Sequence, residues 1–179
     1  ITEDEQPSQA RPEKIAELKP AFSKQGTITA ANSSSISDGA AALLLMSADE
    51  AKKRKLPILA KIKASATYSC APEKFTSAPI GAINQLLSDA QWSTDDVDLY
   101  EINEAFAMVT MLAIKQLELP AEKVNIYGGA CALGHPIGCS GARILVTLIH
   151  ALRRKGLHKG VASLCIGGGE ATAMAIEVV

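Results

Sequence analysis

The sequence predicts a layered α/β fold in which helices cover a mixed β-sheet. Strand-like and helix-like runs alternate along the second half of the chain, the pattern of a sheet packed against helices. Two glycine-rich segments, 128–141 and 167–169, each follow a strand-like run, where α/β sheets place their functional loops. The composition agrees, because 47% of the 179 residues are hydrophobic and only 4% are aromatic, which suits helices packed closely on a sheet.

Charge and composition exclude several classes of function. The net charge of −1 gives no general attraction to nucleic acid or to an anionic membrane. No apolar run approaches the ~20 residues that span a bilayer, and no signal peptide is evident. The four cysteines lack the spacing of a small secreted domain, so a cytoplasmic location is expected. A start at Ile1 on a polar segment favours a fragment or a processed product.

The first 56 residues predict mostly loops with two short regular elements. Residues 1–26 are polar and proline-containing, which indicates a loop-rich lead-in or a disordered tail. Residues 26–39 are rich in Ser, Asn, Asp and Gly, the composition of turns. The continuous apolar run 40–46 predicts a strand buried on both faces. Ser47 and Glu50 form a capping-box pattern, which predicts a short helix that ends in solvated cations at 52–55.

The rest of the chain predicts the sheet and its helices. Strands are expected at 57–68, 97–102, 124–127, 161–166 and 172–179. Amphipathic helices are expected at 80–90, 104–119 and 140–156, the last ended by Gly156. Loops are expected at 72–79 and at 128–139, and a tight turn at 167–170. Because five glycines in residues 128–143 imply unusual backbone angles or close approach to a ligand, His135 within this segment is a candidate catalytic group.

Three segments resemble motifs of the thiolase family. Residues 134–143 match its GHPIGxSGAR signature, residues 103–107 read NEAFA, and residues 165–169 match its CxGGG motif. They follow the family's order and spacing, and the resemblance covers nearly the whole chain but only the C-terminal part of a thiolase. It implies a thiolase-like layered fold with the lead-in and the last part of the N-terminal domain at 1–57. The C-terminal domain would occupy 58–179.

The resemblance also implies an acyltransferase of fatty-acid metabolism that reversibly condenses two acetyl-CoA molecules to acetoacetyl-CoA and CoA. Cys165 would be the base or acid for the α-proton, a role that suits a thiol because its pKa is tunable. His135 would activate the nucleophilic cysteine and donate to an acyl oxygen. Asn103 would hold a water at the enolate oxygen, and the Gly167 amide would be an oxyanion donor. No cofactor is implied beyond the coenzyme A thioesters themselves.

Four residues match positions that contact the substrate in the family. Ser34 corresponds to the serine near pantetheine, Ala105 and Phe106 belong to the NEAFA motif, and Phe75 stands where a methionine often borders the acyl pocket. This departure at Phe75 is expected to affect substrate choice. The family also often has Gly, Gly and Asn at three loop positions, which here are Ala31, Ser35 and Ser37.

Three of these residues also have an ordinary structural interpretation. Asn103 is a sound helix N-cap, Cys165 could be a buried structural cysteine, and Phe75 could be ordinary core. His150 and His158 are expected at the surface. The spacing of Cys131, His135 and Cys139 is not that of a zinc knuckle and shows no fourth ligand, so no metal site is expected.

The nucleophilic cysteine of the family lies in the N-terminal half, and none of the four cysteines has its context. The chain is therefore expected to be inactive alone and active with the missing N-terminal half. The resemblance implies that the intact protein forms a homodimer or homotetramer. A degradative 3-ketoacyl-CoA thiolase of longer chain length and a non-catalytic CoA- or lipid-binding relative remain alternatives. A ketoacyl synthase is disfavoured, since it typically uses two histidines, or His and Asn, without a second catalytic cysteine such as Cys165.

Overall fold

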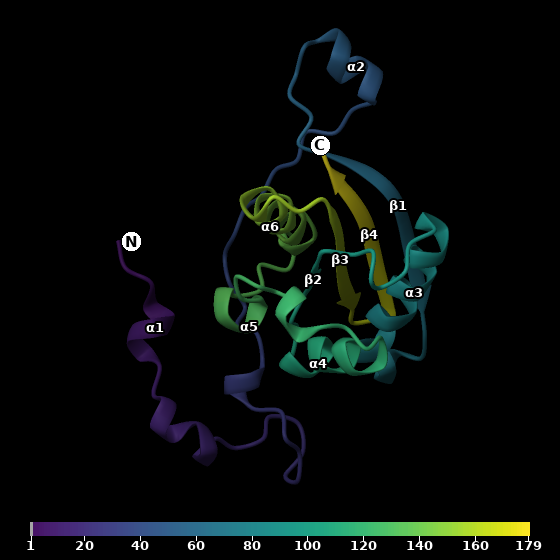
Figure 1. Ribbon diagram of the computed structural model, residues 1–179. Coiled ribbons are helices and arrows are strands. Elements are labelled where there is room, and N and C mark those ends of the chain that lie inside the picture. Colours follow the sequence, from purple (N-terminus) through teal and green to yellow (C-terminus); the bar gives the residue numbers. More distant parts are fainter. Residues whose placement is uncertain (1) are drawn as a thin grey trace.

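The computed structural model describes residues 2–179 and contains one four-stranded mixed sheet with helices on both faces (Figure 1). The strand order is β1-β4-β3-β2, with β1 antiparallel to β4, β4 antiparallel to β3, and β3 parallel to β2. This confirms the predicted α/β class and the mixed sheet. The strands are β1 (Ala60–Ser69), β2 (Leu99–Ile102), β3 (Lys159–Ile166) and β4 (Glu170–Val178).

Side-chain alternation along the strands divides the interior into two apolar clusters, one on each face of the sheet. Tyr100, Ile102 and Cys165 pack with α3 (Ala78–Ala90) and α4 (Ala107–Gln116). On the other face, Leu99 and Ala162 pack under α6 (Ser140–Lys155). The two faces are visible in Figure 1, where α6 and α3 lie on opposite sides of the strands. Cys165 therefore points away from α6.

The first part of the chain lies outside this core. The lead-in extends away from the body of the molecule, with exposed helices, and leads into the predicted polar loop (Figure 1). Among residues 2–59, Ala51 alone is buried. The short elements here are α1 (Glu5–Gln9), η1 (Pro12–Glu17), η2 (Ala30–Asn32) and α2 (Ala48–Lys53), where η denotes a 3-10 helix.

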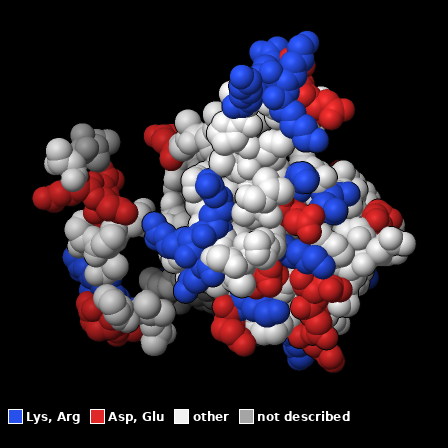
Figure 2. Space-filling view, turned by 45° about the horizontal axis from the view of Figure 1, so that its top comes forward, with Lys and Arg blue, Asp and Glu red and all other residues white. Residues whose placement is uncertain are grey.

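The predicted cap and the solvated cations of α2 are confirmed. The Ser47 hydroxyl accepts a hydrogen bond from the Glu50 amide at 3.2 Å. Glu50 does not reach back to Ser47, because its carboxylate pairs with Arg54 one turn later. Lys and Arg side chains gather on the surface of this segment in Figure 2, and residues 52–55 are all exposed.

The strand predicted at 40–46 is wrong. The segment has no regular structure, and Leu44 and Leu45 are 80% and 69% exposed. A strand forms only where a neighbouring strand accepts its backbone hydrogen bonds, and within residues 2–179 none pairs with this segment.

Several other element bounds also differ from the prediction. Residues 124–127 form a single bridge, Val124 to Tyr100, because the chain turns at Asn125, whose φ is +49°. The helix expected from 104 begins at Ala107. The glycine-rich loop contains a one-turn helix, α5 (Ala130–Leu133), and two connections contain η3 (Pro72–Ser77) and η4 (Ala121–Lys123). Helix α6 ends as predicted, with Gly156 in the left-handed region at φ +67°.

Candidate active site

The parallel strands β2 and β3 bring Asn103 and Cys165 to the same edge of the sheet. Asn103 directly follows β2, and its backbone N–H donates to the Ser163 carbonyl of β3 at 2.9 Å. Cys165 lies two residues further along β3. Both residues are buried, at 1% and 8% exposure. The carboxyl ends of these two strands therefore carry two of the predicted catalytic side chains, as α/β sheets commonly do.

The glycine-rich loop brings His135 to the same edge. Its backbone amide donates to the Ser35 carbonyl at 2.9 Å, which fixes the loop against the polar segment 33–37. Gly134 lies at φ +88°, and a side chain there would collide with Ser37. The ring then lies with Nε2 3.3 Å from Asn103 Nδ2 and Nδ1 2.6 Å from Ser140 Oγ. Asn103 therefore contacts the catalytic candidate and does not cap a helix, since Phe106 holds that position.

The surroundings of His135 favour its neutral form. Burial lowers the pKa of the imidazole, and the nearby Arg143 guanidinium lowers it further. A neutral ring near pH 7 has one free lone pair and can take a proton. The site thus provides a histidine suited to act as a base.

Cys165 and the glycine turn complete the edge. Burial raises the pKa of the Cys165 thiol, so the group holds its proton near neutral pH and forms a strong base once it is lost. The turn that follows is held by a hydrogen bond from the Gly169 amide to the Ile166 carbonyl at 3.0 Å. Gly167 is exposed and has no atom within 4 Å of the place where a side chain would start. Its surroundings leave room for a ligand atom.

The four predicted substrate-binding residues lie in one continuous group. The Ser34 hydroxyl and amide both donate to the Ala105 carbonyl, at 3.0 and 3.2 Å. The Phe106 ring meets the Phe75 ring edge-on, with 6.3 Å between centroids. The Phe22 ring of the lead-in also meets the Phe106 ring edge-on, with 5.8 Å between centroids, and extends the group to three rings.

Comparison with known proteins identifies the family. The model of the thiolase C-terminal domain matches residues 56–178, and the model of the thiolase N-terminal domain matches residues 1–49. The chain belongs to the thiolase family. This membership, with the motifs above, excludes the ketoacyl synthase interpretation.

The chain is similar to acetyl-CoA acetyltransferases and to a 3-ketoacyl-CoA thiolase. An acetyl-CoA acetyltransferase of Chromobacterium violaceum is 52% identical over 163 residues, 91% of this chain and 42% of its own length. The crystal structure of the Bacillus anthracis acetyl-CoA acetyltransferase superposes with a TM-score of 0.91 at 50% identity, over 93% of this chain and 42% of that one. Human mitochondrial 3-ketoacyl-CoA thiolase in complex with CoA superposes with a TM-score of 0.88 at 40% identity, over 96% and 43%. The chain thus spans less than half the length of these thiolases.

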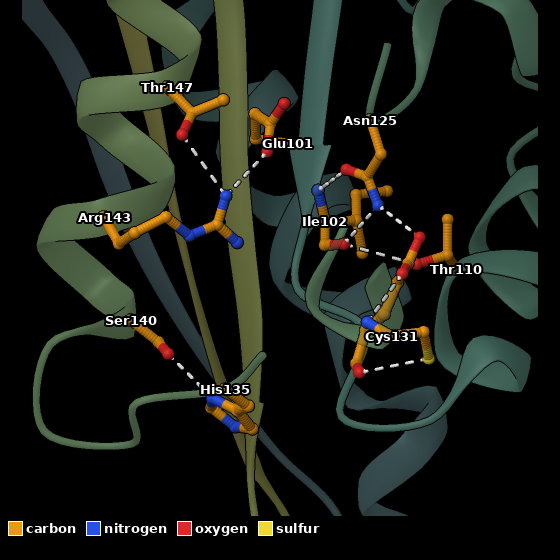
Figure 3. A network of polar contacts seen from close by, with 10 residues as sticks. Glu101, Ile102, Thr110, Asn125, Cys131, His135, Ser140, Arg143 and Thr147 are labelled. Atoms are coloured by element: carbon orange, nitrogen blue, oxygen red, sulfur yellow. Dashed lines mark hydrogen bonds and ion pairs between the residues drawn. The ribbon is translucent and has the colours of Figure 1, made fainter. Parts of the chain in front are cut away.

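A cluster around Glu104 of the NEAFA motif supports the thiolase loop and was not predicted from the sequence. Its carboxylate accepts from the Asn125 side-chain amide at 2.9 Å and from the Cys131 backbone amide at 3.1 Å. Asn125 also bonds the amide and the carbonyl of Ile102, each at 2.8 Å (Figure 3). The end of β2 is therefore tied to the start of α5. In the sequence, only the separation between the end of a strand and a polar residue in a later loop could have indicated this cluster.

A second unpredicted pair lies on the α6 face of the sheet. Arg143 of α6 contacts the buried Glu101 carboxylate at 3.5 Å and Thr147 at 3.3 Å (Figure 3). Burial raises the pKa of Glu101 to about 7, against the opposing effect of Arg143. The pair places the Arg143 guanidinium one helical turn from Ser140, close enough to lower the pKa of His135.

Two further findings concern residues 2–179. No helix in this range is both long and apolar enough to cross a membrane. The same range holds no cluster of three or more His, Cys, Asp or Glu side chains with the arrangement of a metal site. His150 and His158 are exposed, as predicted.

Proposed function

We propose that the complete thiolase containing this sequence catalyses the reversible condensation of two acetyl-CoA molecules to acetoacetyl-CoA and CoA. The observation that carries the proposal is the contact between Asn103 and His135 at the sheet edge where the parallel strands β2 and β3 end, the same edge that holds the buried Cys165. This edge combines a neutral histidine with a thiol that holds its proton. Claisen chemistry on thioesters needs such a pair.

In the direction of thiolysis, a cysteine thiolate from the rest of the protein attacks the 3-keto carbon of the substrate. His135 Nε2 takes the proton of that cysteine before the attack. The bond between C2 and C3 then breaks, and its electrons form the enolate of acetyl-CoA, which takes the proton of the Cys165 thiol. The thiol of a new CoA gives its proton to the Cys165 thiolate and displaces the acyl group from the nucleophile.

Two groups of this chain would stabilise the developing negative charge. Asn103 and His135 face the enolate oxygen, through a water that Asn103 holds. The Gly167 amide faces the oxyanion of the acyl-cysteine step, since the glycine turn leaves space beside it. The group of Ser34, Ala105, Phe106 and Phe75 would hold the pantetheine arm and the acyl chain.

The nucleophile has to come from outside this chain, so we propose that the chain alone is inactive. Several of its apolar side chains are left in solvent near the site, with Ile36 92% and Ile137 69% exposed. Exposed apolar surface of this kind is covered in the assembled protein. We expect the N-terminal half of the thiolase to cover it and to supply the cysteine.

The test is thiolysis of acetoacetyl-CoA, followed as loss of its enolate absorbance when CoA is added. The full-length protein should be active, and this chain alone should not. Addition of a separately expressed N-terminal half should restore turnover in proportion to complex formation. Turnover by the 179-residue chain alone would contradict the requirement for an external nucleophile.

A longer-chain 3-ketoacyl-CoA thiolase is the second candidate, since human mitochondrial 3-ketoacyl-CoA thiolase also superposes closely. The two candidates differ in the ratio of kcat/KM for 3-ketooctanoyl-CoA and acetoacetyl-CoA. A ratio above about ten would assign the degradative function. A ratio below one would support the acetyltransferase.

A non-catalytic CoA-binding function would follow if the complete protein lacked the nucleophile. Iodoacetamide labelling of the full-length protein tests this, because a catalytic thiolase has one reactive cysteine that acyl-CoA protects. We further expect a cytoplasmic homodimer or homotetramer without a bound cofactor. Light scattering of the full-length protein gives the assembly state.

A further inference from the structure

The Ser140 hydroxyl makes two hydrogen bonds, one to the His135 ring and one to the Pro136 carbonyl. Ser140 is the first residue of α6 and is 1% exposed. Its hydroxyl donates to the Pro136 carbonyl at 3.1 Å, and its oxygen lies 2.6 Å from His135 Nδ1. The same carbonyl accepts the Ser140 backbone amide at 2.9 Å, which fixes the serine in place (Figure 3 shows the Ser140–His135 contact).

A hydroxyl has one proton to donate, and the Pro136 carbonyl at 3.1 Å can only accept it, whereas the His135 nitrogen can act either as donor or as acceptor; we infer that the proton lies on the Pro136 side. The Ser140 oxygen can then only accept from His135, so the ring proton lies on Nδ1. A neutral imidazole has one protonated nitrogen, and Nε2 consequently has a free lone pair. The hydrogen bonds run in one direction, from Nδ1–H to Ser140 and from Ser140 to Pro136.

We propose that Ser140 is a positioning residue that fixes His135 in the Nδ1–H tautomer and so presents the Nε2 lone pair to the reacting groups. The inference rests on the proposed function and deepens it. With the tautomer fixed, Nε2 accepts the proton of the nucleophilic thiol without prior rearrangement of the ring. After that transfer, Nε2–H is the donor to the acyl oxygen, while Nδ1–H remains bound to Ser140.

The Asn103 amide, in the orientation that the structure gives it, agrees with this direction. Its Nδ2 group lies 3.3 Å from Nε2 and can donate to it only if that nitrogen has no proton. The Asn103 Oδ1 atom is buried and has no partner within residues 2–179. With the Asn103 amide in this orientation and the Ser140 proton on Pro136, the opposite tautomer would place two donors at Nε2 and two acceptors at Nδ1.

Nitrogen NMR of the histidine side chains tests the tautomer directly, because protonated and unprotonated ring nitrogens have well separated shifts. The 179-residue chain has three histidines, and His150→Gln and His158→Gln assign the signal of His135. At pH 8 we expect protonated Nδ1 and unprotonated Nε2. Ser140→Ala should lower the ratio of Nδ1–H to Nε2–H about five- to tenfold, the effect of one lost hydrogen bond.

Two variants separate this effect from a general loss of structure. Ser140→Thr retains the hydroxyl and should restore the ratio. Ser88→Ala removes an exposed serine from the last turn of α3 and should leave the ratio unchanged. A wild-type spectrum dominated by Nε2–H would overturn the proposal, as would an unchanged ratio in a folded Ser140→Ala chain.

In the full-length protein, Ser140→Ala should lower kcat for thiolysis about tenfold, with KM changed less than twofold. Partial recovery by Ser140→Thr would agree with positioning. The two proposals fail separately. An inactive full-length protein with the Nδ1–H tautomer would remove the proposed function alone, whereas an active protein with Nε2–H would remove the role of Ser140 alone.

Discussion

The Glu104 carboxylate occupies the space that a side chain at Gly129 would need. A Cβ built on Gly129 would overlap both carboxylate oxygens. The carboxylate is held in this position by Asn125 on one oxygen and by the Cys131 amide on the other. The glycine at 129 is therefore required for the contact that joins the end of β2 to the loop of His135.

We expect Gly129→Ala to destabilise the protein by about 2–4 kcal/mol, because either Glu104 or the loop has to move. Urea unfolding of this chain measures the change. Gly141→Ala is the matched control, since nothing lies within 4 Å of its added carbon and the site is within α6. It should stabilise the chain by about 0.5–1 kcal/mol. Equal effects of the two substitutions would contradict the role of Glu104.

Glu101 should make stability depend on pH. Its pKa is raised from 4.5 to about 7, so the folded state holds a proton that the unfolded state releases. Stability therefore falls as pH rises from about 4.5 to 7, and Glu101→Gln removes this dependence. The stability of the variant relative to wild type should rise by about 3 kcal/mol between pH 4.5 and pH 8.

Urea midpoints at four or five pH values in this range give the curve. Glu73→Gln, which removes a carboxyl from the exposed surface of η3, is the control for the loss of one charge. A constant difference between wild type and Glu101→Gln across the range would show that Glu101 stays ionised beside Arg143.

The sequence predicted the sheet and the long helices well, because their apolar periodicity is local. Residues 140–156 show a clear inner face and a terminal glycine, and α6 has nearly those bounds. The segment 40–46 failed for a non-local reason, since hydrophobicity alone does not provide a neighbouring strand. The start of α4 was misplaced because Asn103 is a good N-cap in isolation, yet its side chain bonds His135.

The candidate site shows the same difference between residues that a local motif marks and contacts between residues far apart in the sequence. His135, Asn103 and Cys165 could be named because family motifs mark them, and the first two are now placed in contact. Glu101 and Arg143 lie 42 positions apart, and the sequence gives no sign that they meet. The role of Ser140 was missed although it lies five residues after His135, because it depends on where one hydroxyl proton points.

Cys165→Ser should lower kcat of the full-length protein about 10²- to 10⁴-fold, the usual contribution of a general acid or base. KM for acetoacetyl-CoA should change little. Exchange of the α-protons of acetyl-CoA with solvent should be lost in parallel. Cys139→Ser is the control, since Cys139 is half-buried at the start of α6 and its side chain makes no capping bond. Retained exchange in Cys165→Ser would assign the base to another group.

The raised pKa of Cys165 predicts a slow reaction with iodoacetamide near neutral pH. Because only the thiolate reacts, its alkylation rate should rise about tenfold per pH unit from pH 7 to 9. Mass spectrometry of this chain follows the four cysteines separately. A rate that levels off below pH 8 would indicate that some group in the folded protein lowers the pKa instead.

Phe75 has two interpretations, a wall of the acyl pocket or a part of the core, and substrate preference distinguishes them. Its ring meets Phe106, next to the carbonyl that Ser34 binds. If it limits the pocket, Phe75→Ala should raise kcat/KM for 3-ketohexanoyl-CoA relative to acetoacetyl-CoA about tenfold, and Phe75→Leu should give a smaller rise. Leu87→Ala removes a buried side chain of α3 and should cost stability without changing this ratio. A ratio that changes equally in Phe75→Ala and Leu87→Ala would place Phe75 in the core, because loosening of the fold would then account for both.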